Sequence, residues 1–237
     1  MIKIPKVKKY KYMKNFIEEK CSLSKNKVPE FYKPDYKDLY LLYKYITLNK
    51  RLSVLEFGSG YSSIVMSKAL NENKKRHFSK LKKIEHMPKF KIHSYENMKK
   101  YYLKLKKIKR KNKLANLQIN YSHVKYKLIN NRICTKYTGL RFKNPDFIYL
   151  DGPSPKTVKG LHLDMPMSGD ILYYEHFFNP GTIIVIDGRT ANSRFLKTNF
   201  QRNWIYTHDK QNDQSIFLLK ENPLGKKNKA LLDFYKS

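Results

Sequence analysis

The sequence has few of the residues that mark disulfide-bonded, zinc-binding or membrane-spanning proteins. Its 237 residues include only two cysteines, Cys21 and Cys134, which are far apart and outside any Cys-x-x-Cys spacing. This spacing argues against a disulfide framework or a zinc cluster and fits a reducing, cytoplasmic location. No apolar run reaches the roughly 18 residues of a transmembrane helix. The basic N-terminus lacks an apolar core, so a secretory signal is not expected there.

Acidic residues are also scarce, with 19 Asp and Glu against 50 Lys and Arg, which gives a formal net charge of +31. A charge of this size fits a polyanionic partner such as nucleic acid, lipid head groups or acidic glycans. Only 8 of the basic residues are Arg, however, although proteins that recognise phosphates or bases favour Arg over Lys. Compositional drift therefore stands beside a functional interpretation of the charge.

The positive charge is concentrated in one part of the chain. Residues 74–113 hold 17 basic and 2 acidic side chains, whereas residues 144–200 hold 5 basic and 6 acidic ones. A polyanionic substrate should meet positive charge beside the reacting groups. The near-neutral second segment, which carries several of the candidate site residues below, therefore favours a small ligand over a nucleic acid.

One stretch predicts a ligand-binding turn between a strand and a helix: Ser53-Val54-Leu55-Glu56-Phe57-Gly58-Ser59-Gly60-Tyr61-Ser62-Ser63. The apolar residues before Gly58 suit a buried strand, predicted to begin at Leu52. Gly58 and Gly60 permit a tight turn and leave no Cβ between the backbone and a ligand. Ser62 or Ser63 can cap the following helix, predicted to reach Asn71, while Glu56 lies near the carboxyl end of the strand, where open α/β sheets bind ligands.

The glycine pattern discriminates among nucleotide-binding loops. A phosphate-binding P-loop requires Gly-Lys-Ser/Thr after the turn, and none follows. A dinucleotide-binding loop requires a third glycine where Ser63 stands. The stretch resembles instead the first motif of the class I S-adenosylmethionine (SAM)-dependent methyltransferases, of the form acid-x-Gly-x-Gly.

A second acid-ended strand is predicted over residues 90–96, ending on Glu96, with Asn97 capping a basic helix that runs to about Lys113. In a βαβ nucleoside fold, the acid that ends the second strand accepts hydrogen bonds from the ribose hydroxyls. Glu85 is a competing candidate because it lies nearer in sequence to the first motif. Glu96 is favoured because its strand is better formed and a long amphipathic helix follows it at once.

Residues 145–155 predict a third acid-ended strand, which closes on Asp151 and continues into turn residues. This stretch resembles the fourth methyltransferase motif, whose acid faces the SAM sulfonium. The loop 156–168 follows and contains His162, and a helix capped by Ser168 is predicted to reach Phe178. His176 in that helix is expected to be a packed core residue rather than a catalyst.

A β-branched strand over residues 180–187 ends on Asp187, and Arg189 follows it. The remaining predicted elements are a helix from Asp35 to Leu48, a polar insertion at 72–90, a third strand at 122–128, a helix at 191–200, and a hairpin of strands 204–208 and 215–219. Strands and helices alternate, which predicts a mostly parallel sheet with helices on both faces.

The whole pattern is similar to the seven-stranded, Rossmann-like class I methyltransferase fold with a C-terminal β-hairpin. The resemblance covers about residues 35–220. Residues 1–34 are expected to be a basic N-terminal extension with one helix near residues 12–20. Residues 221–237 are expected to be a polar C-terminal tail with a short helix near Leu231.

The resemblance implies SAM as cofactor and assigns roles to individual residues. The cofactor would contact Glu56, Phe57, Gly58, Ser59, Gly60, Tyr61 and Ser62. Glu96 would hold the ribose, Asn97 or Met98 would flank the adenine, and Asp151 would lie beside the methyl donor. Asp151 and then Asp187 are the candidate catalytic bases, and Arg189 and His162 are candidate substrate contacts.

Two departures from related patterns narrow the expected chemistry. Gly188 replaces the Asn that would complete a Mg²⁺ site with Asp151 and Asp187 in some O-methyltransferases, so no metal is expected. The Asn-Pro-Pro-Tyr motif of adenine-N6 enzymes is absent. The predicted function is methyl transfer to a small-molecule, glycan or lipid-linked acceptor. The alternatives are an RNA methyltransferase that uses residues 74–113, or a non-catalytic nucleotide-fold protein that binds polyanions.

Overall fold

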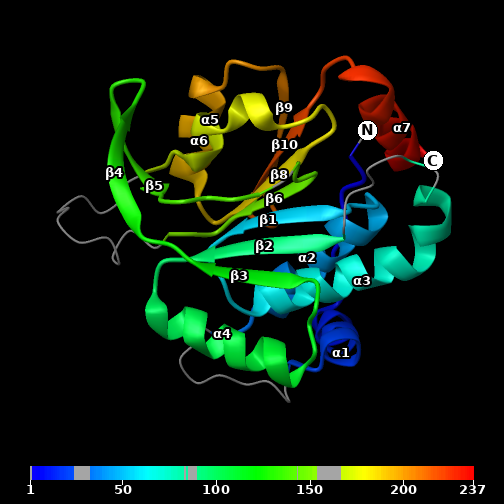
Figure 1. Cartoon of the computed structure of the whole chain (residues 1–237). Helices are drawn as coiled ribbons and strands as arrows, with labels where there is room; N and C mark the ends of the chain where they lie inside the picture. The colour runs from blue at the N-terminus through cyan, green and yellow to red at the C-terminus, as the bar shows by residue number, and fades with distance from the viewer. Residues whose placement is uncertain (1, 24–32, 83, 85–89, 143, 154–166) are drawn as a thin grey trace.

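A computed structural model describes residues 2–23, 33–82, 84, 90–142, 144–153 and 167–237. Its centre is a seven-stranded sheet with the strand order β3-β2-β1-β6-β8-β10-β9 (Figure 1). The strands are β1 (Ser53–Phe57), β2 (Lys91–Glu96), β3 (Leu117–Tyr121), β6 (Phe147–Leu150), β8 (Ile183–Asp187), β9 (Trp204–Asp209) and β10 (Gln214–Leu219). The first five of the ordered strands are parallel, and β10 pairs antiparallel with both β8 and β9. The predicted fold class, including the C-terminal hairpin, is confirmed.

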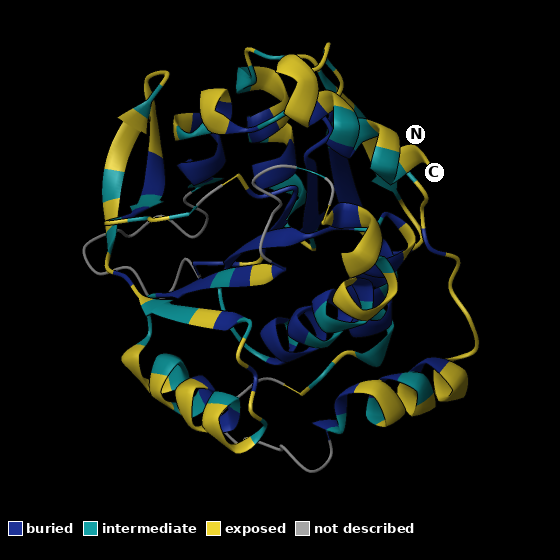
Figure 2. Ribbon diagram, turned by 45° about the vertical axis from the view of Figure 1, so that its right-hand side comes forward, coloured by how far each residue is buried: buried dark blue, intermediate teal, exposed yellow. Residues whose placement is uncertain are grey.

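Alternation along β1 shows why both faces of the sheet are covered. Val54 packs into the apolar cluster on one face, while Leu55 and Phe57 pack into the cluster on the other. Successive strand side chains point to opposite faces, so a strand that is apolar at neighbouring positions must be buried on both. Figure 2 shows the central strands in dark blue, as buried elements between outer layers.

Helices form one layer on each face of the sheet. On one side lie α1 (Tyr10–Cys21), α2 (Tyr36–Leu48), α3 (Tyr61–Leu81) and α4 (Lys99–Lys111), and on the other lie α5 (Asp170–Tyr173) and α6 (Thr190–Asn199) (Figure 1). Asp35 caps α2 as predicted, because its carboxylate accepts the amide hydrogens of Lys37 and Asp38 at 2.8 and 3.3 Å.

The helix α3 is longer than predicted and continues through the first part of the expected polar insertion. Its basic residues Lys74, Lys75 and Arg76 are exposed, whereas Asn73 and Leu81 are buried. The Asn73 side chain donates to the carbonyls of Ile46 and Arg51 at 2.9 and 2.8 Å, which fixes this part of the helix against the end of α2. The lysines therefore form a solvated helix face rather than a loop.

A small second sheet was not predicted. Strands β4 (Val124–Ile129), β5 (Arg132–Tyr137) and β7 (Met167–Ser168) form it, and the β4–β5 pair is an antiparallel hairpin. The predicted third strand at 122–128 falls on β4, whereas the third strand of the main sheet is β3 at 117–121. Both segments are β-like in composition, and parallel pairing with β2 selects the earlier one.

The segment predicted as a helix from Ser168 also differs. Ser168 ends β7, and the helical part is divided into the short α5 and a 3₁₀ turn at Glu175–Phe177. Hydrogen bonds in both directions between the Ser168 backbone and the Asn192 side chain hold this residue in the strand. The short helix therefore starts at Asp170, after Gly169.

The terminal segments contain helices that pack on the domain. Met13, Ile17 and Cys21 of α1 are buried in the apolar cluster beneath α2 and α3. The C-terminal helix α7 (Gly225–Lys236) buries Leu231 beside the amino end of the sheet. The division of the chain at residues 34 and 221 into extension, domain and tail stays a prediction.

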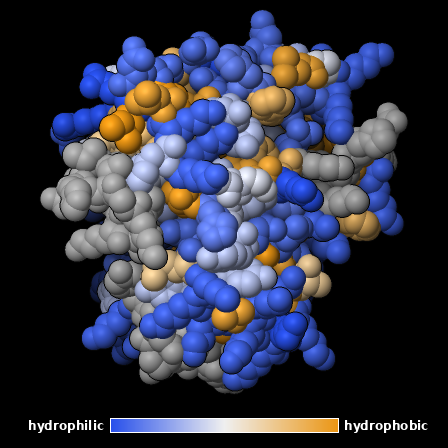
Figure 3. Space-filling view, turned by 60° about the vertical axis from the view of Figure 1, so that its left-hand side comes forward, coloured by the Kyte–Doolittle hydropathy of each residue, from blue (hydrophilic) through white to orange (hydrophobic). Residues whose placement is uncertain are grey.

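Both cysteines are free and buried, and burial raises the pKa of Cys21 to about 12 and of Cys134 to about 11. None of the helices in the described residues is both long and apolar enough to cross a membrane. Figure 3 shows one face of the molecule on which hydrophilic side chains predominate and hydrophobic ones gather in small groups.

Candidate functional site

The glycine-rich turn between β1 and α3 lies against the residues that follow β6. Gly58 has φ +93°, a conformation that L side chains rarely adopt, and a Cβ there would lie 3.1 Å from the amide nitrogen of Gly152. Gly58 donates its amide hydrogen to the Tyr95 carbonyl at 2.9 Å, and Asp151 donates to the Phe57 carbonyl at 3.0 Å. Glycine at position 58 is thus required for β1, β2 and β6 to end side by side.

Glu56 holds the turn in place from within the protein. It is fully buried, and its two carboxylate oxygens each accept a hydroxyl, from Ser62 and Ser63, at 2.6 Å. Burial raises the pKa of Glu56 to about 7, against the effect of these hydrogen bonds. The carboxyl group therefore fixes the first turn of α3 and does not open onto a cavity.

Glu96 ends β2, as predicted, and lies behind the same turn. Its Oε1 accepts the amide hydrogen of Met98 at 2.7 Å, and its Oε2 accepts the Ser59 hydroxyl at 2.8 Å. Burial raises the pKa of Glu96, although backbone and hydroxyl donors oppose this effect. The cap of α4 is Met98 rather than the predicted Asn97, because α4 begins at Lys99. The competing candidate Glu85 lies outside the described residues.

A cavity of about 180 Å³ opens at the carboxyl ends of the parallel strands. Its walls come from the glycine-rich turn, from the ends of β6 and β8, and from α2 and α4. The lining residues from the turn are Ser59, Gly60, Tyr61 and Ser62. The rest of the polar wall consists of two tyrosines, one lysine and four acids: Tyr101 of α4, Tyr149 of β6, Lys33, Asp35, Asp38, Asp151 and Asp187.

Asp151 follows β6 and opens onto this cavity. Loss of hydration raises its pKa to about 6; the Arg189 guanidinium opposes the shift, while the negative charges of Asp38 and Glu96 add to it. A carboxyl group with a pKa near 6 is ionised at neutral pH yet close enough to neutrality to exchange protons.

The second catalytic candidate, Asp187 at the end of β8, shares a proton with a residue that the sequence analysis did not select. The carboxyl groups of Asp38 and Asp187 are hydrogen-bonded to each other. Burial and the negative charge of Asp187 raise the pKa of Asp38 to about 7. Asp38 was missed because an acid in the first turn of a helix is an ordinary electrostatic feature.

Arg189 follows β8 and contacts the segment after Asp151. Its Nη2 donates to the Pro153 carbonyl at 2.7 Å, while its buried Nη1 has no hydrogen-bond partner among the residues that the structure describes. The buried hydroxyl of Tyr137 on β5 has the Gly58 amide beside it, but it donates to no acceptor in the described part of the chain. Burial raises the pKa of that phenol well above its usual value, so it is protonated and able to donate. Two polar groups near Asp151 thus have unused hydrogen-bonding capacity.

Only some of the predicted site residues line the cavity. The turn residues from Ser59 to Ser62 line the cavity together with Asp151 and Asp187, whereas Phe57 and Gly58 lie beneath it in the packed ends of the strands. His162 lies outside the described residues. His176 is exposed and contacts Gln201 at 3.1 Å, so the expectation of a packed core histidine is wrong. The helix there is too short to bury it.

Metal ligation is not evident in the residues that the structure describes, where no group of three or more His, Cys, Asp or Glu side chains is arranged to hold an ion. Asp38, Asp151 and Asp187 lie around the same cavity. Asp38 and Asp151 affect Asp187 in different ways. Asp38 shares a proton with it, and Asp151 repels it.

The sequence matches no protein-family model and no curated protein. Solved structures with the same fold do exist. The methyltransferase PaMTH1 from Podospora anserina, solved with S-adenosylhomocysteine (SAH), is 11% identical, with a TM-score of 0.55 over 89% of this chain and 95% of that one. The protein yhhF from Escherichia coli is 12% identical, with a TM-score of 0.50 over 83% and 92% of the two chains. The fold is therefore that of the class I methyltransferases.

Proposed function

We propose that this chain is a SAM-dependent methyltransferase that acts on a small-molecule, glycan or lipid-linked acceptor. The observation that carries the proposal is the junction at the carboxyl edge of the sheet. There the Gly58 turn packs on Gly152, the acid-ended strand β2 lies behind it, and Asp151 opens onto the adjoining cavity. Open α/β sheets bind ligands at this edge.

The residues at the turn fit the cofactor. A Cβ at Gly60 would meet no atom within 4 Å, so the backbone here faces open space and a ligand can approach it closely. The Oε2 of Glu96 accepts a hydrogen bond from the Ser59 hydroxyl. Rotation of the Ser59 side chain about χ1 would break this hydrogen bond. A ribose hydroxyl would take the place of Ser59. The cavity of about 180 Å³ accommodates one part of SAM, and the rest would extend along the turn.

When bound, SAM supplies a methyl group on a sulfonium, and the chain must supply orientation and a proton acceptor. Displacement at a sulfonium depends mainly on the alignment of the acceptor atom. Asp151 is the proposed base, because its pKa of about 6 leaves it ionised at neutral pH. Asp187 is less suitable, since its carboxyl is engaged with Asp38.

The acceptor is proposed to carry an anionic or hydrogen-bond-accepting group. The Nη1 of Arg189 and the Tyr137 hydroxyl are buried donors without an acceptor in the described residues. Arg189 acts on Asp151, and the Tyr137 hydroxyl lies beside the adjacent Gly152. Buried donors without partners are costly to the protein, so a substrate group that accepts from them would be favoured. We expect Arg189→Ala to weaken acceptor binding and to leave SAM affinity unchanged.

An RNA acceptor is the second candidate, supported by the position of α4. This helix contributes Tyr101 to the cavity wall, and it carries the exposed residues Lys106, Lys107 and Lys111. Binding through phosphates would weaken steeply as salt is raised and would be similar for unrelated sequences. Salt-insensitive affinity, or no RNA binding, excludes this alternative.

Calorimetric titration of the purified protein with SAM, SAH and NAD⁺ tests the cofactor assignment before any acceptor is known. We expect SAM and SAH to bind and NAD⁺ not to bind, because Ser63 occupies the position of the third dinucleotide-motif glycine. Failure of both sulfur nucleosides to bind a folded sample would refute the proposal.

A further inference from the structure

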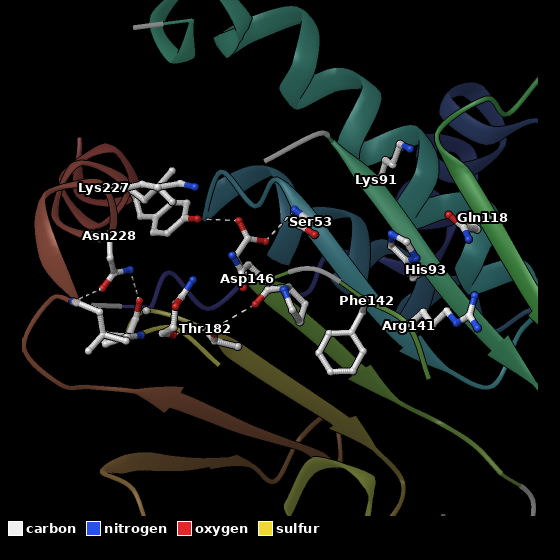
Figure 4. A pocket seen from close by; sticks show the side chains of 18 residues that line it. Ser53, Lys91, His93, Gln118, Arg141, Phe142, Asp146, Thr182, Lys227 and Asn228 are labelled. Atoms are coloured by element: carbon white, nitrogen blue, oxygen red, sulfur yellow. Dashed lines mark hydrogen bonds between the residues drawn. The ribbon is translucent and has the colours of Figure 1, made fainter. Parts of the chain in front are cut away.

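A larger cavity, of about 990 Å³, lies at the opposite edge of the sheet from the proposed methyl-transfer site. Ser53 begins β1, Lys91 begins β2, and Asp146 directly precedes β6; all three line it. The helix α7 forms another wall through Lys227 and Asn228 (Figure 4). The site proposed above is at the carboxyl ends of these strands, so this cavity requires an explanation of its own.

The acid in this cavity is already engaged by the protein. Asp146 accepts the amide hydrogens of Leu52 and Ser53 at 2.8 and 3.0 Å, and the Tyr235 hydroxyl at 2.7 Å. The fully buried Arg51 guanidinium is close enough to lower the Asp146 pKa, although burial dominates and raises it. Asp146 is therefore a structural link between β1 and α7, and its charge is balanced locally.

The cationic side chains around the cavity have no such partners. Among the described residues, no carboxylate pairs with Lys91, Arg141 or Lys227, and all three are exposed. Figure 4 shows Lys91 and Arg141 on the side of β2, and Lys227 across from them on α7. Positive groups on two facing walls of a concave site concentrate the field inside it.

His93 adds a buried polar atom to the cavity. Its Nδ1 has no hydrogen-bond partner in the described ranges of the chain, and the side chain projects from β2 toward Phe142 and Arg141 (Figure 4). Burial, together with the charge of Lys91, lowers the pKa of His93, so its ring is neutral near pH 7. A neutral imidazole whose Nδ1 carries the hydrogen can donate it to an anionic oxygen.

The remaining wall is apolar, with Phe142, Leu224 and Leu231 among the lining residues. A volume of about 990 Å³ is within the range of small-molecule sites and far exceeds that of a single phosphate ion. The cavity therefore has space for an organic group beside the charged one.

We infer that this cavity is a binding site for a small organic phosphate. Its phosphate would lie between Lys91, Arg141 and Lys227 and accept from His93, and its organic part would lie against Phe142 and Leu224. A polynucleotide fits this concave site less well than the open lysine face of α4. The inference does not depend on the proposed methyl transfer.

The test is calorimetric titration with inorganic phosphate, inorganic pyrophosphate and vesicles that contain phosphatidic acid. We expect pyrophosphate to bind saturably and more tightly than phosphate, because it carries more negative charge into a cavity lined by cations that pair with no carboxylate in the described residues. The double variant Lys91→Ala/Lys227→Ala should lose about tenfold or more in pyrophosphate affinity. Lys210→Ala is the matched control. Lys210 is an exposed lysine at the β9–β10 turn, on the side of the sheet where the parallel strands end.

A second readout separates local binding from general charge attraction. Pyrophosphate should shift the ring signals of His93 in NMR spectra, and this shift should be lost in the double variant while its unfolding midpoint remains unchanged. Equal weakening by Lys210→Ala, an unshifted His93, or binding to vesicles but not to pyrophosphate would each overturn the inference.

Discussion

Asp38 in the first turn of α2 and Asp187 at the end of β8 are joined by a hydrogen bond between their carboxyl groups. One of two carboxyl groups in such a bond must carry a proton. The pair therefore stores a proton at the wall of the proposed cofactor cavity. It also ties the helix that precedes the sheet to a strand near the other end of the chain.

Asp38→Asn should stabilise the protein above neutral pH. The folded-state pKa of Asp38, about 7, is above its unfolded value, so the pair's contribution is complete at about pH 4 and is lost as the pH rises through about 7. The Asn amide donates without a titrating proton. We expect the midpoint of thermal unfolding at pH 8 to rise by about 2–4 °C.

The measurement is a comparison of thermal midpoints for the wild type and Asp38→Asn at pH 4.5 and pH 8. Taking the difference between the two proteins cancels the pH dependence of all other groups. This difference should grow as the pH rises. An equal difference at both pH values would show that the carboxyl pair does not hold its proton as described.

Gly58→Ala and Gly60→Ala should have different effects although the two glycines are one residue apart. At Gly58 the positive φ and the backbone of Gly152 at 3.1 Å oppose a Cβ, so we expect a loss of about 1–3 kcal/mol in unfolding free energy. At Gly60 a Cβ meets open space, and stability should stay within about 0.5 kcal/mol.

The same pair of variants tests the cofactor contact. Gly60→Ala should weaken SAM binding while its denaturant midpoint is unchanged, because the added methyl group occupies space that the ligand needs. Urea unfolding and SAM calorimetry on both variants give the answer. Full SAM affinity in Gly60→Ala would place the cofactor elsewhere.

Glu96→Ala should reduce SAM affinity by about tenfold or more, because a carboxylate that accepts from the ribose is lost. Ser59→Ala is the matched control. Since Ser59 occupies Oε2 of Glu96 at 2.8 Å, removing its hydroxyl should leave the affinity unchanged or improve it. Calorimetry of the two variants distinguishes these outcomes. Retained affinity in Glu96→Ala would make Glu85 the ribose candidate.

SAM and SAH should respond differently to pH if Asp151 faces the sulfonium. Asp151 becomes ionised as the pH rises through about 6. The cationic SAM should then gain about tenfold in affinity relative to SAH, which lacks the sulfonium charge, between pH 5 and pH 7.5. In Asp151→Asn this difference between the ligands should disappear. A parallel response of SAM and SAH in the wild type would separate Asp151 from the methyl donor.

The parts of the fold that the sequence predicts well are those with local patterns. The β-branched run of β8 and the Glu56–Gly60 turn can each be recognised from a few neighbouring residues. The alternation of such strands with helices then predicts the parallel sheet. The position of β3 depends on which of two adjacent β-like segments pairs with β2. Tertiary contacts decide which segment pairs with β2, and the local sequence pattern does not distinguish the two.

The site was predicted where residues are contiguous and missed where the fold assembles them. Ser59 and Gly60 stand in one motif, but Asp38 comes from α2 and Tyr137 from the second sheet. Glu56 was assigned to the cofactor, yet its position is fully buried against two serine hydroxyls. A carboxylate next to a glycine-rich turn has the same sequence signal whether it binds the ligand or the turn itself.

The two buried cysteines provide the protein with internal reporters of motion. Cys21 is covered by the packing of α1, and Cys134 is covered within the small sheet. A thiol with a raised pKa and no access to solvent reacts only when its surroundings open. The alkylation rate of Cys21 in the native state therefore measures how often the first helix undocks. The alkylation rate of Cys134 measures how often the small sheet opens, and neither measurement needs an added label.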